Sequence, residues 1–258
     1  MSDKAKIDVE LQGHVAVLTI DNPPANTWTP GSLEQLAMHM QHLQQDRAIY
    51  SVILTGQGER FFSAGADLHQ FSSGDKALAW EVAQRFEQAF SALRRFRGVV
   101  IAAINGYAMG GGLEAALACD IRIAERHAVM ALPEAQVGLL PCAGGTQQLP
   151  RLVGEGWAKR IILCGERLQA QQAQDIGLVE IVTSPGESLS TALALADQVA
   201  KQSPGSVAAC KTLIEASYQP CDGRVLEREA FLQLFDSYDQ QEGVAAFLEK
   251  RKPRWRNS

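Results

Sequence analysis

Two glutamates stand in segments whose composition suits acid–base chemistry. Glu114 follows the glycine run Gly110–Gly112, and Glu134 follows Pro133 in an apolar stretch. Burial in apolar surroundings raises the pKa of a carboxyl group and lets it act as an acid near neutral pH. Two such groups together can take a proton from one reacting atom and supply a proton to another. For Glu134, the segment alone leaves a helix-capping or surface role open.

The glycine run indicates that main-chain N–H groups are offered to a ligand, because glycine is unfavourable within a helix and allows close approach to the backbone. A helix N-terminus presents free N–H donors and a partial positive charge. Phosphate is one possible guest, although the spacing is not that of a P-loop. An oxyanion is the other, because Gly111 and Glu114 are three residues apart and share one face of the first turn. A purely structural glycine turn is the alternative.

A second run of small residues, Phe62-Ser63-Ala64-Gly65-Ala66-Asp67-Leu68, follows an expected strand. Ligands of open α/β sheets bind at the carboxyl ends of the strands, where this run falls. A plain tight loop is the alternative. The nearby Gly56-Gln57-Gly58 fails as a dinucleotide fingerprint, because Phe61 stands where the third glycine is required.

The elements that must position these residues alternate between strand and helix over the first ~140 residues, which predicts an α/β fold with a largely parallel sheet. Loops are expected over 56–67 and 105–110. After Gly144 the pattern is mostly helical, over 145–178 and 187–250. The expected elements are a strand at 14–20 with a hairpin partner at 7–12, a helix at 31–46, a strand at 50–55, a helix at 77–97, a strand at 99–104, a helix at 111–118, and strands at 121–123 and 129–131.

Composition and charge exclude several classes of protein. The chain has 258 residues and a formal net charge of −5, which does not favour a general nucleic-acid surface. No apolar run suits a signal peptide or a membrane span. The five cysteines and five histidines show no metal-ligand spacing, so no metal is predicted. A protein of the reducing cytoplasm, with no membrane partner, is expected.

Together, the segments Phe62–Asp67, Gly106–Glu114, Pro133-Glu134 and Pro141–Gln147 resemble the enoyl-CoA hydratase/isomerase (crotonase) superfamily. The resemblance covers nearly the whole chain and is greatest to monofunctional enoyl-CoA hydratases. It implies a spiral of ββα repeats over residues 1–195. It also implies a C-terminal helical region, 196–258, that makes oligomer and coenzyme A contacts. A homotrimer, or a homohexamer made of two trimers, is the implied assembly.

The resemblance also implies the parts of the site. Catalysis falls to Glu114 and Glu134, which carry out syn addition of water to trans-2-enoyl-CoA and give 3-hydroxyacyl-CoA. The backbone N–H groups of Ala66 and Gly111 form the oxyanion hole. No resident cofactor is implied, because coenzyme A is carried by the substrate. The implied coenzyme A contacts are Ala25, Ala64, Ala66, Asp67 and Leu68, with Phe247 and Lys250 of the basic C-terminus supplied by a neighbouring subunit.

Some properties stay open at this point. Cys142 occupies a position where the related hydratases usually have glycine, which puts a thiol near Glu134. Another crotonase-type reaction on acyl-CoA, such as isomerisation, dehydration or hydrolysis, is the alternative activity. A binding role toward RNA or acyl-CoA without turnover is a third hypothesis. Acyl chain length, pathway, and trimer versus hexamer are not determined by the sequence.

Overall fold

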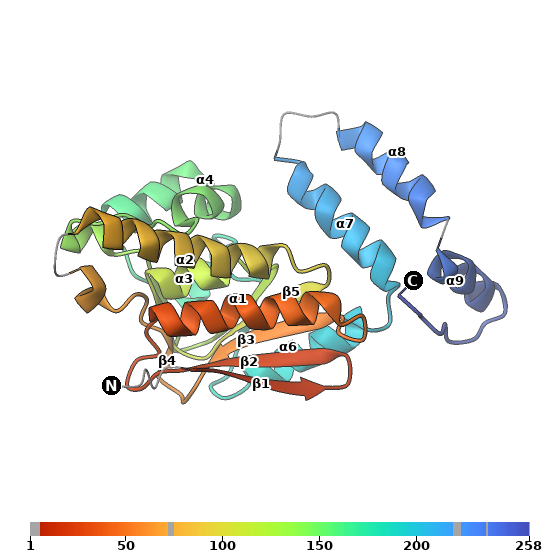
Figure 1. The fold of residues 1–258 in the computed structure, drawn as a ribbon, viewed down its shortest axis with the longest axis horizontal. Coiled ribbons are helices and arrows are strands. Elements are labelled where there is room, and N and C mark those ends of the chain that lie inside the picture. The colour runs from red at the N-terminus through yellow and green to blue at the C-terminus, as the bar shows by residue number, and fades with distance from the viewer. Residues whose placement is uncertain (1–5, 72–74, 219–222, 236, 258) are drawn as a thin grey trace.

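Six strands form the larger sheet of the computed structural model, which describes residues 6–71, 75–218, 223–235 and 237–257 (Figure 1). β1 (Lys6–Gln12) and β2 (Val15–Asp21) form the predicted antiparallel hairpin. All other neighbours in the order β1-β2-β3-β5-β7-β10 are parallel, so the predicted parallel core is confirmed. The strands that follow β2 in this order are β3 (Ser51–Gly56), β5 (Val99–Ile104), β7 (Ile121–Glu125) and β10 (Ile181–Thr183).

A second sheet contains short strands in the order β4-β6-β8-β9, of which only β9 is antiparallel to its neighbour. Three strands of the first sheet, β3, β5 and β7, are each followed by a short strand of the second sheet and then by a helix. The order is β3-β4-α2 (Lys76–Arg94), β5-β6-α3 (Gly111–Leu117) and β7-β8-α4 (Gly145–Leu163), with a short 3-10 helix before α2 and before α4. This repeated ββα unit is the crotonase-type spiral. The short strands are β4 (Phe61–Ser63), β6 (Tyr107–Met109), β8 (Val129–Ala131) and β9 (Leu168–Gln169).

The short strands correct the sequence-based assignment of elements. Loops are predicted over 56–67 and 105–110, but these segments contain β4 and β6, and β9 interrupts the helical stretch predicted over 145–178. Strands of two or three residues are too short for an alternating pattern to show. They form because partners distant in sequence pair with them, as Phe61 does with Tyr107.

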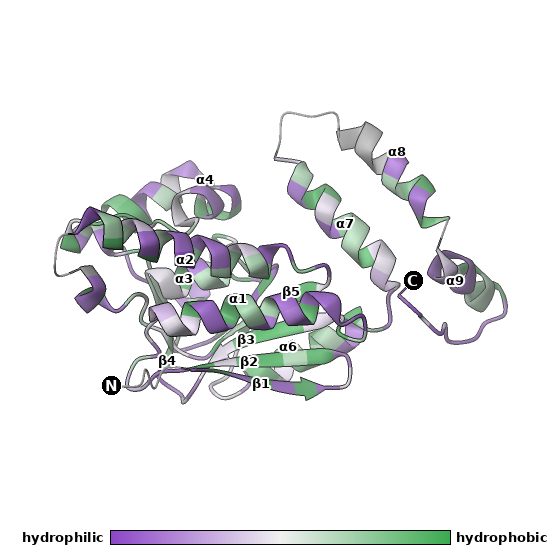
Figure 2. Ribbon diagram, viewed as in Figure 1, coloured by the Kyte–Doolittle hydropathy of each residue, from purple (hydrophilic) through white to green (hydrophobic). Residues whose placement is uncertain are grey.

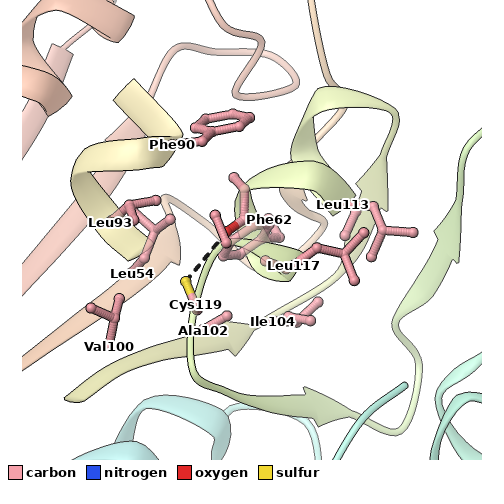
Figure 3. Packing of buried hydrophobic residues seen from close by; sticks show 14 of the residues in the cluster. Leu54, Phe62, Phe90, Leu93, Val100, Ala102, Ile104, Leu113, Leu117 and Cys119 are labelled. Carbon is pink, nitrogen blue, oxygen red and sulfur yellow. Dashed lines mark hydrogen bonds between the residues drawn. The ribbon is translucent and has the colours of Figure 1, made fainter. Parts of the chain in front are cut away.

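Helices cover both faces of the larger sheet. In β3, Val52 and Leu54 face the larger hydrophobic cluster, whereas Ile53 faces a smaller cluster that includes Ala192 and Ala196 of α6 (Ser188–Val199). Figure 3 shows part of the larger cluster, where side chains of α2 and α3 lie beside those of β3 and β5. A sheet buried on both faces explains the nearly continuous apolar runs of its strands. The helices that contribute to the larger hydrophobic cluster include α1 (Pro30–Gln45), α2, α3 and α4.

The last helices extend away from the sheets (Figure 1). They are α7 (Pro204–Ala216), α8 (Gly223–Leu234) and α9 (Tyr238–Leu248). Figure 2 shows hydrophobic residues along α7 and α8, and exposed apolar side chains of this region include Ile214, Phe231, Leu232, Phe247 and Leu248. The expected division between residues 195 and 196 falls inside α6.

The chain end returns to the core. The amide of Asn257 donates to the carbonyl of Arg47 at 2.8 Å, and the carboxylate of Asp239 accepts from the backbone of Arg256 and Asn257. Among the described residues, no helix combines the length and apolarity needed to cross a membrane. Cys221 and residues 1–5, on which part of the cysteine and signal-peptide arguments rested, lie outside the described residues.

Candidate active site

A pocket of about 230 Å³ brings the singled-out segments together. Its walls come from the loop after β4, from α2, from the N-terminus of α3, and from a 3-10 helix, η2 (Glu134–Val137), with the segment that follows it. The carboxyl ends of the parallel strands β4 and β6 lead into this pocket, as the sheet geometry predicts. The lining residues are Ala64, Gly65, Ala66, Leu68, Phe86, Met109, Gly110, Gly111, Glu114, Pro133, Glu134, Gln136, Val137, Leu139, Leu140 and Cys142.

Glu114 is held firmly on one wall of the pocket. It lies in the first turn of α3 and is buried. Its Oε1 accepts hydrogen bonds from the backbone N–H groups of Ala143 at 2.8 Å and Gly145 at 2.9 Å. Burial raises the pKa of Glu114, and these two N–H groups oppose that rise because they stabilise the charged form. Its Oε2 accepts no hydrogen bond from the described residues, so this oxygen is available to a substrate or water.

Glu134 is the first residue of η2, directly after Pro133. Its Oε2 is buried and has no hydrogen-bond partner within the described part of the chain. Its Oε1 lies 3.2 Å from the position that a Cβ on Gly110 would occupy, which places this carboxyl group over the glycine run. Burial raises the pKa of Glu134 to about 7, and the charge of Glu114 adds to the rise. This carboxyl group can therefore hold a proton near neutral pH.

Two pocket-lining residues, Ala66 in the loop after β4 and Gly111 at the start of α3, have main-chain N–H groups that can be offered to a ligand. The backbone N–H of Trp28 donates to the carbonyl of Gly65 at 2.8 Å, and the carbonyl of Trp28 accepts from the N–H of Asp67 at 3.2 Å. These two hydrogen bonds form an isolated parallel β-bridge between Trp28 and Ala66. Backbone groups alternate in direction along an extended segment, so the N–H of Ala66 points away from Trp28. The N–H of Gly111 begins α3 and has no acceptor within this helix.

The loop after β4 and the start of α3 are in contact. Gly65, with a φ of +91°, is packed so closely that a Cβ there would lie 3.2 Å from the N atom of Gly111. The predicted oxyanion-hole residues Ala66 and Gly111 thus line the same pocket as both glutamates.

The predicted coenzyme A contacts divide into two groups. Ala64 donates to the carbonyl of Ala25 at 2.9 Å, and Ala64, Ala66 and Leu68 line the pocket. Asp67 lies beside the pocket, where its Oδ1 accepts from the N–H of His69 at 3.1 Å.

Phe247 and Lys250 lie in α9 and just after it, and neither lines the pocket of its own chain. The side chain of Phe247 is 83% exposed. Nearby, the basic tail is partly neutralised, because the guanidinium of Arg251 pairs with the carboxylate of Glu242 at 2.6 Å. These residues contribute to the site only if a second copy of the chain brings them there.

Sequence reasoning missed the partners of Glu114. Ala143 and Gly145 are 29 and 31 residues further along the chain, and the glycine pair Gly144-Gly145 was the signal available for them. Phe86 of α2 was not singled out as a site residue, but its ring lies against Gly111, since a Cβ on Gly111 would lie 3.0 Å from it. Cys142 lines the pocket, and the residue is exposed in the single chain. Partial removal of its thiol from water, followed by the charges of both glutamates, raises the pKa of this thiol to about 11. Among the described residues, no group of three or more His, Cys, Asp or Glu side chains is arranged to hold a metal ion.

The spiral of ββα repeats and the paired carboxyl groups beside two free amides define a protein of the crotonase class. Residues 10–258 match the family model described as enoyl-CoA hydratase/isomerase, and the chain belongs to this family. It is 41% identical to the "Probable enoyl-CoA hydratase" of Bacillus subtilis (strain 168), over 97% of this chain and 98% of that protein. It is 38% identical to the "Short-chain-enoyl-CoA hydratase" of Clostridium acetobutylicum, over 95% of each chain.

Solved structures give the same result. The structure of Pseudomonas aeruginosa DspI is 60% identical and superposes with a TM-score of 0.95, covering 99% of this chain and 98% of that one. An enoyl-CoA hydratase from Bacillus anthracis is 35% identical with a TM-score of 0.94, covering 98% of this chain and all of that one.

Proposed function

We propose that this protein is an enoyl-CoA hydratase, which adds water to trans-2-enoyl-CoA and releases 3-hydroxyacyl-CoA. The observation that carries the proposal is the pocket in which Glu114 and Glu134 lie beside the N–H groups of Ala66 and Gly111. The names of the relatives favour the same activity. No metal and no resident cofactor are part of the proposal.

In the proposed reaction, the thioester carbonyl oxygen accepts hydrogen bonds from the N–H groups of Ala66 and Gly111. These donors stabilise the negative charge that develops on this oxygen as the β-carbon is attacked, and a donor of this kind typically contributes about 10²–10³ in rate. Phe86 supports the arrangement, because its ring limits the movement of Gly111.

The two glutamates divide the proton transfers. Ionised Glu114, held through Oε1, directs Oε2 to the water and takes one of its protons while the oxygen bonds to the β-carbon. Protonated Glu134 gives its proton to the α-carbon, and its raised pKa supplies this form near neutral pH. Both carboxyl groups lie on one side of the bound thioester, so addition is syn. Glu114 then loses its proton and Glu134 regains one through solvent.

The proposal includes the assembly. Exposed apolar side chains on α8 and α9 suit burial between subunits of a trimer or of a hexamer made of two trimers. In that assembly Phe247 and Lys250 of a neighbouring subunit complete the coenzyme A site that begins at Ala25. A cytoplasmic protein acting in fatty-acid β-oxidation is consistent with this proposal, and sedimentation analysis tests its oligomeric part.

Loss of the conjugated enoyl absorbance of crotonyl-CoA, with identification of the product, tests the activity. We expect 3-hydroxybutanoyl-CoA from the wild type and a rate lower by about 10²–10⁴-fold in Glu114→Gln or Glu134→Gln. Glu155→Gln is the matched control, because Glu155 is an exposed residue of α4 paired with Lys159. Formation of a double-bond isomer, or unchanged hydration in Glu114→Gln, would refute the proposal.

A further inference from the structure

Four large apolar side chains are exposed around the mouth of the pocket. Leu68 begins the 3-10 helix (Leu68–Phe71) that precedes α2, whereas Val137, Leu139 and Leu140 come from η2 and the segment that follows it. Each of them is more than 40% exposed in the single chain. Apolar residues gathered at the mouth of a pocket usually mark the binding site of another molecule.

The composition of the pocket identifies its occupant. Among the described residues that line it, none carries a positive charge, and apart from the two glutamates, Gln136 and Cys142 the lining offers apolar side chains or backbone. Phosphates of coenzyme A would find no cationic partner there. With the thioester at Ala66 and Gly111, the carbons beyond the reacting double bond continue within the same apolar walls.

The volume of the pocket indicates the length of this chain. An apolar cavity of about 150 Å³ holds benzene, which has six carbons, so by proportion about 230 Å³ holds roughly nine carbons. The thioester group and the attacking water occupy part of this space. An acyl chain of about six to eight carbons fills the rest better than the four carbons of crotonyl-CoA do.

We infer that Leu68, Val137, Leu139 and Leu140 form an acyl-tail site that selects medium-length acyl chains over short ones. The inference rests on the proposed function, because it takes the position of the thioester from it. Each additional methylene that leaves water strengthens binding by about fourfold. Four fully buried methylenes, the difference between butanoyl and octanoyl, would together give on the order of 10²-fold.

Binding of saturated acyl-CoA tests the site without turnover. We expect isothermal titration calorimetry of the assembled wild-type protein to give a Kd for octanoyl-CoA at least about tenfold below that for butanoyl-CoA. In Leu139→Gln/Leu140→Gln the ratio of the two Kd values should fall at least about fivefold, because the methylenes would lie against polar groups. Leu68→Gln, on the opposite segment, should lower the ratio too and does not depend on the folding of the η2 segment.

Leu163→Gln is the matched control. Leu163 ends α4 outside the pocket and is 69% exposed, close to the 66% of Leu140, so its ratio of Kd values should equal that of the wild type. Equal wild-type affinities for butanoyl- and octanoyl-CoA would overturn the inference. An unchanged ratio of Kd values in the pocket variants would also overturn the inference. This holds equally if those variants alter the sedimentation of the protein, which would mean that a second copy covers these residues. Absence of crotonyl-CoA hydration would instead refute the proposed function.

Discussion

The pH dependence of hydration follows from the different surroundings of the two glutamates. Glu134 must be protonated to supply the α-carbon, and Glu114 must be ionised to take a proton from water. Burial raises the pKa of Glu134 to about 7, with a further contribution from the charge of Glu114. We therefore expect kcat/KM to fall as the pH rises through about 7, and to fall again in acid as Glu114 becomes protonated.

The size of the alkaline loss can be worked out from the pKa of Glu134. At its ordinary pKa of 4.5, roughly 0.3% of this carboxyl group would be protonated at pH 7, whereas at about 7 roughly half is. With the raised pKa, about 90% is protonated at pH 6 and about 1% at pH 9. The expected fall in kcat/KM between these two values is thus about 90-fold, approaching tenfold per pH unit at the alkaline end.

The assay is the initial rate of crotonyl-CoA absorbance loss from pH 5 to 9.5 at substrate concentrations well below KM. Glu155→Gln should retain the wild-type profile. Glu134→Gln cannot lose a proton, so its reduced rate should show no descending limb near pH 7. A flat wild-type profile between pH 6 and 9, or the same descending limb in Glu134→Gln, would refute the assignment of the acid.

Three further predictions concern stability and reactivity. Because its pKa is raised on folding, Glu134 binds more protons in the folded state than in the unfolded state between pH 4.5 and about 7. As the pH rises through this window, the unfolding free energy of the wild type should therefore decrease relative to that of Glu134→Gln, which urea titrations can measure. Gly112→Ala should destabilise by about 1–3 kcal/mol, because its Cβ would lie 2.2 Å from the carbonyl oxygen of Ser63. Gly156→Ala, with open space around it in α4, should instead stabilise by about 0.5–1 kcal/mol in the same titrations. Alkylation of Cys142 by iodoacetamide should be slow at pH 8, and its rate should rise about tenfold per pH unit up to pH 10. Peptide mass spectrometry measures this rate, and a pH-independent rate would contradict the raised pKa of the thiol.

Features that depend on local spacing could be predicted from the sequence. The three-residue separation of Gly111 and Glu114 placed an amide and a carboxylate on one helical turn, and the structure has both in one pocket wall. The apolar stretch around Pro133 indicated a carboxyl group of raised pKa at Glu134, and burial has that effect in the structure. The β1–β2 hairpin and the longer strands of the parallel sheet also followed from apolar runs that are local in the chain.

Features that depend on distant pairing could not be predicted in the same way. β4 and β6 have three residues each, and only their pairing with each other and with β8 makes them strands. The hydrogen bonds from Ala143 and Gly145 to Glu114 join residues about 30 apart, and no periodicity records such a contact. Both are set by the tertiary fold, which overrides the preference of short segments.

The two backbone hydrogen bonds to Glu114 also affect how the chemistry of this fold can change over evolutionary time. Loss of the carboxylate at position 114 would leave the buried N–H groups of Ala143 and Gly145 without an acceptor. Each unpaired donor would cost about 1–3 kcal/mol of stability. Loss of the carboxylate at position 134 would affect only the backbone N–H of Glu134 itself, because no N–H from elsewhere in the described chain donates to its Oε2. New activities should therefore arise on this fold more readily through replacement of Glu134 than of Glu114.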